Sequence, residues 1–455
     1  MSSHRLPAFF TANEPEYWCD YKDFIKKTSR RYPDYQDGSM FHDLFISHLK
    51  HITTDEEEKA TRRDAAEALL KTTKLKGDVQ ETTLDGSTIE LDKCHEMIYN
   101  FAIEISSVPQ ALAITVTQYD IFVALSGILN ATNYTADEPH PYIDPVTLVK
   151  VRELCQIPDF SKPMRLPLLE ETLEPLRLAF SSGDISRLRT KAQETGNDLP
   201  VIQSVTRDLI SYLCQFPLKP PLECCEFDSV STWHHVLRIV SRDKLSFNPG
   251  ELGSSATKDQ SLFLESNLNA DTSVPAYGRK LDMQLRFRPD TIKKDSILEL
   301  NNSEFKKHDT NDTDLALQLK KNILVNQAML FRLNTQIGLP LDDNVRLLAL
   351  DVRGWLGRII CLRKMDDLWA CDFVCDDTIL LPHNKATWDD FLKGHSIAML
   401  WNYVQHLTIY LEMVVKQELH NNKSTFGRHN QASGKPLSLG QFTFLPTKSR
   451  LKSPQ

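Results

Sequence analysis

The sequence has few glycines and no long apolar run. With 16 glycines in 455 residues, it contains neither a glycine-rich phosphate loop of the Walker or dinucleotide type nor a Gly-x-Ser-x-Gly motif. No apolar run reaches the ~18 residues of a transmembrane helix. The polar start SSHRLPAFFTANEPEYW lacks the apolar segment of a secretory signal. We therefore expect an intracellular protein, nuclear or cytoplasmic, that does not enter a membrane.

The nine cysteines do not follow the spacing of a disulfide framework. Cys371, Cys375 and His383 come nearest to a zinc-binding pattern, but the sequence offers no fourth ligand beside them. Together with the polar start of the chain, this distribution predicts reduced structural thiols in the cytosol or the nucleus.

Charge is distributed unevenly along the chain. The net charge of −8 argues against a protein that coats nucleic acid non-specifically along its whole surface. Residues 279–332 nevertheless hold 11 Lys and Arg against 8 Asp and Glu, so this stretch carries +3 while the rest of the chain carries −11. A modestly basic stretch on an acidic body suits an enzyme that touches a few phosphates.

The length of the chain predicts two or three domains at about 150 residues each. Pro217, Pro220 and Pro221 interrupt a helical pattern, and we place the main boundary there because proline inside a helix costs about 3 kcal/mol. We expect a mainly helical N-terminal domain over residues 1–220 and an α/β domain over residues 221–420, followed by a polar, disordered tail at 421–455. The expected fold class is therefore α/β (α+β).

The spacing of apolar residues predicts the elements on both sides of this boundary. Before it, we expect six helices, over residues 53–74, two between 91 and 131 that break near Pro109, and 146–154, 169–190 and 200–215. After it, we expect helices over residues 229–242, 313–334 and 397–419, a loop at 246–255, and three strand patterns between 346 and 382.

The most informative stretch is GRKLDMQLRFRPDTIKKDSILELNNSEFKK, residues 278–307. Apolar and polar residues alternate from Leu281 to Arg288, which is the pattern of a half-buried strand. Residues 289–296 are polar and contain turn-forming residues. We therefore predict that residues 281–287 and 297–305 are adjacent antiparallel strands joined by a hairpin turn.

Such a hairpin brings Asp282 close to Glu304 and Lys306, which follow it after 21 intervening residues as Glu-x-Lys. Two carboxylates can share a divalent cation such as Mg²⁺, because hard cations take oxygen ligands. Lys306 lies on the same side of its strand as Glu304, since strand side chains alternate with period 2, and it can approach a metal-bound water or a phosphate. Asn301 and Asn302 indicate a solvated strand end. The alternative is a salt bridge on an exposed strand edge.

This arrangement resembles the PD-(D/E)XK nuclease superfamily, in which a strand ends in the first acid, a hairpin follows, and the next strand carries (D/E)-x-K. Asp282 matches the first acid, and Glu304 and Lys306 match the second motif. Leu281 stands where the family name has proline. The resemblance covers roughly residues 220–385, and the residues around the motif are similar to those of fungal proteins with nuclease-like domains. It implies a three-layer α/β restriction-endonuclease-like core behind a helical domain.

The resemblance also implies further site residues. Family members often carry an acid on the helix before the strands; Glu226 is the first candidate here, with Asp228 and Glu265 as alternatives. An acid at a helix start is otherwise only a partner of the helix dipole. Members also place a polar or basic residue on the helix after Glu-x-Lys, where this chain has Gln318, Lys321 and Asn322.

The metal ligands and phosphate contacts follow from the same resemblance. Mg²⁺ or Mn²⁺ is expected on Asp282, Glu304 and the backbone carbonyl of Phe305. Arg279 and Lys280 precede the first acid and are the candidates for binding nucleic-acid phosphates.

Two functions are consistent with these residues. The first is a metal-dependent nuclease that hydrolyses phosphodiester bonds of DNA or RNA, with a helical N-terminal half that positions substrate or binds a partner protein. The second is a nuclease-fold protein that has lost catalysis and serves as a binding or effector module. Convergence of Asp282, Glu304 and Lys306 on an open groove favours the first function; their separation, or their burial without a groove, favours the second.

Overall fold

The computed structural model describes residues 116–132, 140, 143–163, 166–194, 199–268, 278–288, 297–342, 345–365, 368–424 and 443. All of them belong to one compact unit formed by residues 97–102 and 109–455. The helix expected at 53–74, the first helix expected after residue 91 and nearly all of the expected tail lie outside the described residues. No helix in the described ranges is long and apolar enough to cross a membrane.

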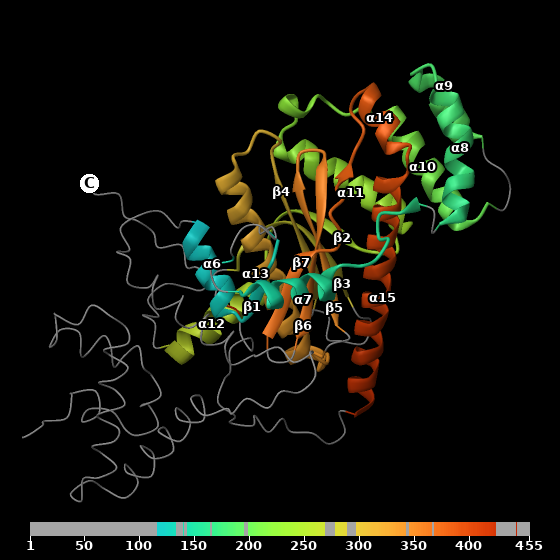
Figure 1. Ribbon diagram of the computed structural model, residues 1–455. Helices are drawn as coiled ribbons and strands as arrows, with labels where there is room; N and C mark the ends of the chain where they lie inside the picture. Colours follow the sequence, from blue (N-terminus) through green and yellow to red (C-terminus); the bar gives the residue numbers. More distant parts are fainter. Residues whose placement is uncertain are drawn as a thin grey trace, which may run out of the picture. The chain divides into compact units, whose positions relative to one another are not determined.

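A mixed β-sheet stands at the centre of the described residues (Figure 1). Seven strands follow the order β1-β7-β6-β5-β4-β3-β2, and β8 pairs with β6. Neighbouring strands are antiparallel except for the parallel pairs β1–β7 and β4–β5. The strands are β1 Ile128–Asn130, β2 Phe247–Gly253, β3 Lys280–Phe287, β4 Leu298–Lys306, β5 Arg346–Arg353, β6 Leu356–Met365, β7 Leu368–Phe373 and β8 Ile379–Leu380.

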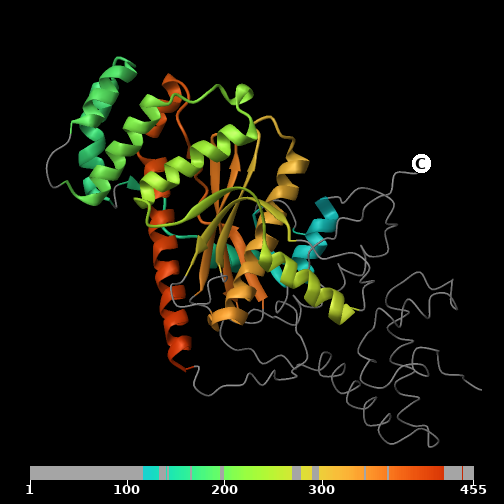
Figure 2. The same ribbon diagram turned by 180° about the vertical axis from the view of Figure 1, so that it is seen from behind.

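Helices cover both faces of the sheet (Figures 1 and 2). Asn301 of β4 donates a hydrogen bond to Tyr403 of α15, whereas the next residue, Asn302, donates one to Asn322 of α13. Because neighbouring strand residues point to opposite faces, α13 and α15 lie on opposite sides of β4. The helices near the sheet are α6 Val116–Leu125, α7 Pro145–Cys155, α11 Glu226–Ser241, α12 Ser255–Leu268, α13 Asp312–Ile337, α14 Lys385–Phe391 and α15 His395–Ser424.

Packing between helices completes the two covering layers. Helices α6 and α12 contact α13, and α11 contacts α15 as well as β2 and β4. Helices α8 (Pro167–Phe180), α9 (Ile185–Gln193) and α10 (Val201–Gln215) pack on one another, and α10 contacts α11. The described structure is therefore an α+β fold in which the sheet lies between helices.

Three local expectations differ from the structure. The single helix expected at 169–190 is two helices, because Gly183 takes φ +76° and Asp184 caps α9 through the backbone N–H groups of Ser186 and Arg187. The loop expected at 246–255 is largely the edge strand β2, where a proline is tolerated because one side of an edge strand needs no ladder bonds. The helix expected up to residue 131 ends at Leu125, and β1 follows.

The described residues on the two sides of residue 220 share one sheet. Apart from the three-residue β1, residues 116–215 are helical or loop where they are described. β1 pairs with β7, with Leu129 opposite Ala370. Residues 116–215 and 221–424 therefore contribute to the same compact unit.

Trp233 joins α11 to the turn after β5. Its side chain is fully buried, and its indole N–H donates to the backbone carbonyl of Gly354 at 3.0 Å. The ring also lies so close to Gly357 that a Cβ at that position would meet it at 2.7 Å. This packing fixes α11 on the sheet and, with it, the start of the helix at Glu226.

Replacement of Trp233 by Ala should lower the free energy of unfolding by about 3–5 kcal/mol, because it leaves a cavity and removes an anchoring hydrogen bond. Phe227→Ala on the same helix is the matched control, since Phe227 is 78 % exposed and the change should stay within about 0.5 kcal/mol. Urea denaturation followed by circular dichroism measures both values. Equal losses in the two variants would contradict this role of Trp233.

Candidate functional site

The predicted hairpin is confirmed by strands β3 and β4. They pair in antiparallel fashion, and the pair nearest the candidate residues joins Met283 to Ser303. The next residues, Asp282 at the start of β3 and Glu304 near the end of β4, therefore lie side by side. The Asp282 carboxylate accepts a 2.8 Å hydrogen bond from the backbone N–H of Phe305. Both acids thus lie at the end of the hairpin that is away from its turn.

Glu304 is almost fully buried, with 1 % of its surface exposed. Its Oε1 accepts from Asn302 at 2.9 Å, and its Oε2 lies 2.5 Å from the Lys321 ammonium. Burial raises the pKa of Glu304 above its ordinary value and the negative charge of Asp282 adds to the rise, whereas Lys321 and Asn302 oppose it. The Glu304 carboxyl is therefore enclosed between one ammonium and one amide, and burial favours its protonated form.

Lys306 reaches the start of α11. Its ammonium lies 3.5 Å from the Glu226 carboxylate, and both side chains are partly exposed. Of the acids considered before the strands, Glu226 is thus the one that contacts Lys306. Asp228 instead pairs with Lys219 and caps α11. Glu265 lies in α12, and its side chain is outside the described residues.

Helix α13, which follows the Glu-x-Lys motif, contributes polar side chains that contact β5 as well as the hairpin. Gln318 donates to the Asp351 carboxylate at 3.0 Å rather than to a residue of the hairpin. Lys321 contacts Glu304 and also donates to the Lys280 carbonyl at 3.2 Å. Asn322 donates to the Leu350 carbonyl and accepts from Asn302. Helix α13 therefore presents three polar residues to the carboxyl ends of β4 and β5.

Asp351 is a site residue that sequence reasoning missed. It lies opposite Glu304 in the parallel pairing of β4 and β5, so the two side chains share a face of the sheet. Burial raises the pKa of Asp351 to about 7; Gln318 and Asn322 oppose the rise, and Glu304 adds to it. An acid that interrupts the apolar run RLLALDVRG was the available signal.

Buried amides form the floor of the site. Asn302, Asn322 and Asn326 are at most 1 % exposed. The side-chain oxygen of Asn322 accepts hydrogen bonds from the side-chain amides of Asn326 and Asn302. The side-chain oxygen of Asn326 accepts from the backbone N–H of Asn302. The expectation that Asn301 and Asn302 mark a solvated strand end is wrong, because both are fully buried. Asn302 instead belongs to a network that ends on the Glu304 carboxylate.

Arg279 and Lys280 have partners within the protein. Arg279 donates to the Tyr119 hydroxyl at 3.2 Å, and its backbone N–H donates to Thr257. The Lys280 carbonyl accepts from Lys321, while the Lys280 residue itself is exposed. The structure thus places Lys280 at the rim of the site and ties Arg279 to α6 and α12.

The oxygen donors suit a cation that keeps part of its water shell. Within the described ranges, no three His, Cys, Asp or Glu side chains are grouped closely enough to hold a metal ion together. Asp282 and Glu304 supply two carboxylates, and the backbone of Phe305 runs between Glu304 and Lys306 with its N–H on Asp282. Mg²⁺ is commonly held by one or two carboxylates and several waters, so this donor set fits it. A cation that needs a full cage of protein ligands does not fit.

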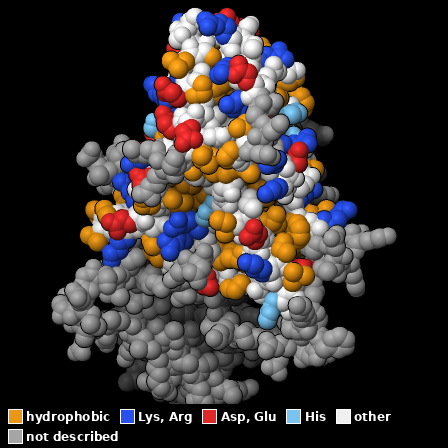
Figure 3. Space-filling view, turned by 90° about the vertical axis from the view of Figure 1, so that its right-hand side faces the viewer, with side chains coloured by type: hydrophobic (Ala, Val, Ile, Leu, Met, Phe, Trp, Pro, Cys, Tyr) orange, Lys and Arg blue, Asp and Glu red, His pale blue; other side chains and the backbone are white. Residues whose placement is uncertain are grey.

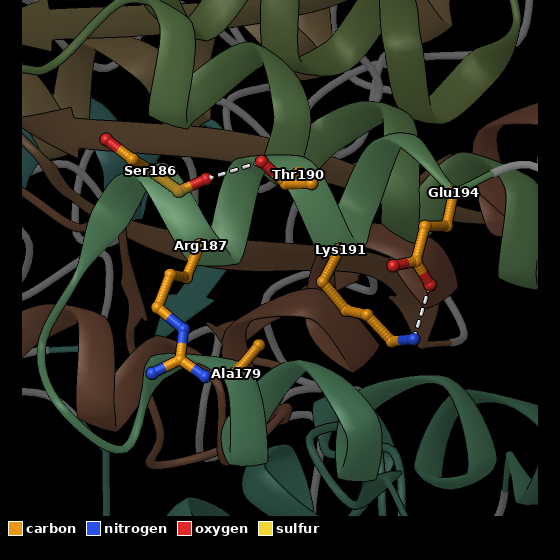
Figure 4. A pocket seen from close by; sticks show the side chains of 6 residues that line it. All are labelled: Ala179, Ser186, Arg187, Thr190, Lys191 and Glu194. Carbon is orange, nitrogen blue, oxygen red and sulfur yellow. Dashed lines mark hydrogen bonds and ion pairs between the residues drawn. The ribbon is translucent and has the colours of Figure 1, made fainter.

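Two surface hollows lie away from these residues. One is between α8 and α9, where Arg187 extends from α9 towards Ala179 of α8, and Lys191 extends towards Glu194 (Figure 4). The other lies between α10 and α11, and its lining includes Tyr212, Phe216 and several charged residues. The face that carries α8, α9 and α15 mixes acidic, basic and hydrophobic side chains, so it is not a uniformly basic surface (Figure 3). Neither hollow includes a candidate site residue.

Comparison of the chain with protein-family models, curated proteins and solved structures finds no match. The chemistry and geometry of the site itself are therefore the basis for a proposed function.

The raised pKa of Asp351 predicts how stability changes with pH. The folded protein keeps this proton up to about pH 7, whereas the unfolded chain releases it near pH 4, so unfolding releases a proton between these values. The contribution of Asp351 to the free energy of unfolding therefore falls as the pH rises from about 4 to about 7. Asp351→Asn removes this loss and keeps an oxygen that can accept from Gln318 and Asn322.

Relative to the unmodified protein, Asp351→Asn should gain roughly 1–4 kcal/mol of stability between pH 5 and pH 8, at about 1.4 kcal/mol per unit of pKa shift. Urea denaturation at both pH values, in the presence of a chelator, measures this difference. Asp389→Asn, at an exposed position of α14, controls for the loss of one negative charge. An equal gain in both variants would count against the role of Asp351.

Proposed function

We propose that this protein is a metal-dependent nuclease that hydrolyses phosphodiester bonds of DNA or RNA, with a core of the PD-(D/E)XK type. The observation that carries the proposal is that Asp282, Glu304 and Lys306 lie at one end of the β3–β4 hairpin. The Asp282 carboxylate accepts a hydrogen bond from the backbone N–H of Phe305, between the other two residues. Two carboxylates and a lysine form a minimal set for metal-assisted phosphodiester hydrolysis.

The order of the elements supports the proposal. Helix α11 precedes the antiparallel strands β2, β3 and β4, with helix α12 between β2 and β3. Helix α13 follows β4, and β5 then pairs in parallel with β4. Helices cover both faces of this sheet, as the resemblance implies for a three-layer core. The carboxyl ends of β4 and β5 lie together, which is where open α/β sheets bind ligands.

The metal ligands in this proposal are the carboxylates of Asp282 and Glu304 and the backbone carbonyl of Phe305, with Mg²⁺ or Mn²⁺ as the cation. When bound, the cation polarises the scissile phosphate and lowers the pKa of a water molecule. The Phe305 N–H holds Asp282 in place, and Asn302 holds Glu304. Both acids are therefore oriented before substrate arrives, as catalysis by preorganised groups requires.

Lys306 provides the positive charge at the reacting phosphate. Its side chain is 35 % exposed, so it can reach a substrate, and the partly exposed Glu226 steadies its ammonium at 3.5 Å. From this position, Lys306 orients the attacking water or stabilises the negative charge that develops. Lys280, exposed at the rim, is the proposed contact for a neighbouring phosphate.

The second candidate function is a nuclease-fold binding or effector module without catalysis. Burial of the site favours it: Glu304 is 1 % exposed and already paired with Lys321, and neither hollow described above is lined by Asp282, Glu304 or Lys306. A protein whose Lys321 never leaves this carboxylate would not take up a metal there. The two functions therefore differ in whether the acids bind a divalent cation.

Glu304→Gln distinguishes these functions. The change keeps the shape of the side chain and removes the charge that binds metal, so cleavage should fall by two or more orders of magnitude, since each 1.36 kcal/mol is about tenfold in rate. The measurement is Mg²⁺-dependent digestion of single- and double-stranded DNA and RNA by the full chain. Glu412→Gln, at an exposed position of α15, is the matched control and should retain activity.

Lys306→Ala, assayed in parallel, should reduce cleavage but keep part of the affinity for nucleic acid, because Lys280 remains. No cleavage of any of the four substrates by the unmodified protein would favour the binding module. Full activity in Glu304→Gln, with an unchanged metal requirement, would refute the proposed site.

A further inference from the structure

Lys321 lies where its ammonium connects both strands of the site hairpin. From α13 it reaches the Glu304 carboxylate of β4 at 2.5 Å and the Lys280 carbonyl of β3 at 3.2 Å. The second lysine of the site, Lys306, contacts Glu226 on a different helix instead. The positive charge of Lys321 is therefore placed at the buried acid, next to the strand that carries Asp282.

The contacts of this ammonium are those of a hard cation. A carboxylate oxygen and a backbone carbonyl oxygen are the ligands that Mg²⁺ or Mn²⁺ takes in proteins. An ammonium group donates hydrogen bonds to the same two kinds of oxygen. Lys321 and a divalent cation on Glu304 therefore need the same negative charge, and they repel each other at this distance.

The burial of Glu304 makes its pairing with Lys321 necessary, and the partial exposure of Lys321 makes this pairing reversible. Glu304 is almost fully enclosed, and a buried carboxylate without a partner is strongly destabilising. The Lys321 side chain is 25 % exposed and has four rotatable methylenes, so its ammonium can turn out to solvent. While it is ionised, Glu304 thus needs a cation beside it, but the cation does not have to be Lys321.

We propose that Lys321 is a built-in placeholder for the metal: its ammonium neutralises Glu304 in the metal-free protein and yields to a divalent cation. Once released, Lys321 faces the substrate side of the site, where it can contact a phosphate of the nucleic acid. This inference rests on the proposed nuclease function, and it concerns the regulation of the same site. It assigns Lys321 a role in controlling metal uptake.

Isothermal titration with Mn²⁺ tests the placeholder without measuring activity. The full chain is titrated as the unmodified protein and as Lys321→Gln, which removes the competing charge. Lys321→Gln should bind Mn²⁺ about tenfold more tightly, because one nearby positive charge has been removed. Lys393→Gln is the matched control: this exposed lysine also forms an ion pair, with Asp390 at 2.8 Å, and its loss should leave Mn²⁺ affinity unchanged.

Thermal unfolding gives a second readout. Without metal, Lys321→Gln should melt at a lower temperature than the unmodified protein, since Glu304 has lost its partner. Mn²⁺ should then raise the melting temperature of Lys321→Gln more than that of the unmodified protein. A purely structural ion pair would give the first effect without the second.

Lys321→Arg keeps the proposal testable if Lys321→Gln does not fold. Its guanidinium retains the charge and can hold the carboxylate with two hydrogen bonds, so Mn²⁺ should bind no more tightly than to the unmodified protein. Tighter binding to Lys321→Arg would overturn the placeholder, as would equal or weaker binding to a folded Lys321→Gln when the unmodified protein binds Mn²⁺. Absence of binding in all of these proteins would overturn the metal site and the proposed function with it.

Discussion

The burial of the Glu304 carboxyl between β4 and α13 is the constraint on which the arrangement of this site depends. A carboxylate removed from water needs hydrogen bonds and a counter-charge, or it takes up a proton. Asn302 and Lys321 supply these contacts, and Asn322 orients Asn302 in turn. This requirement explains why the inner face of α13 carries amides where a helix packed on a sheet would usually carry apolar residues.

Charged residues form a row across the sheet beside Glu304. Register places Glu304 opposite Asp351, and Asp351 opposite Arg358, so these side chains lie on one face of three neighbouring strands. Arg358 lies over the ring of Phe373 at 3.4 Å, and burial lowers its pKa while Asp372 and Asp351 oppose the change. The row therefore has the half-buried guanidinium of Arg358 at one end and the partly exposed ammonium of Lys321 at the other.

Sequence reasoning found the parts of the site that follow from local periodicity. Alternation in residues 281–288, the polar turn segment 289–296 and the strand that returns at 297–305 were sufficient to predict the hairpin, because a turn between two strands fixes their pairing. It missed Asp351, since the pairing of β4 with β5 is set by the crossover helix α13 and not by any local pattern. It predicted that Asn302 is solvated, because a sequence does not show whether water or another amide forms the hydrogen bonds of a side-chain amide. The edge strand β2 was missed because its proline and glycines are typical of a loop.

The two functions considered for this protein differ in the free energy with which Glu304 binds each of three competing cations. A proton, the ammonium of Lys321 and a divalent cation compete for the same buried negative charge on Glu304. The proton is favoured by burial, the ammonium by its tether on α13, and the divalent cation by its double charge and by the second carboxylate, Asp282. Under the proposed function, only the divalent cation would use both acids at once, so the proximity of Asp282 to Glu304 favours the metal over the proton and the ammonium. In the binding module the same two acids would instead be held by the Lys321 ammonium and the Phe305 N–H, so the two functions differ in what neutralises the pair.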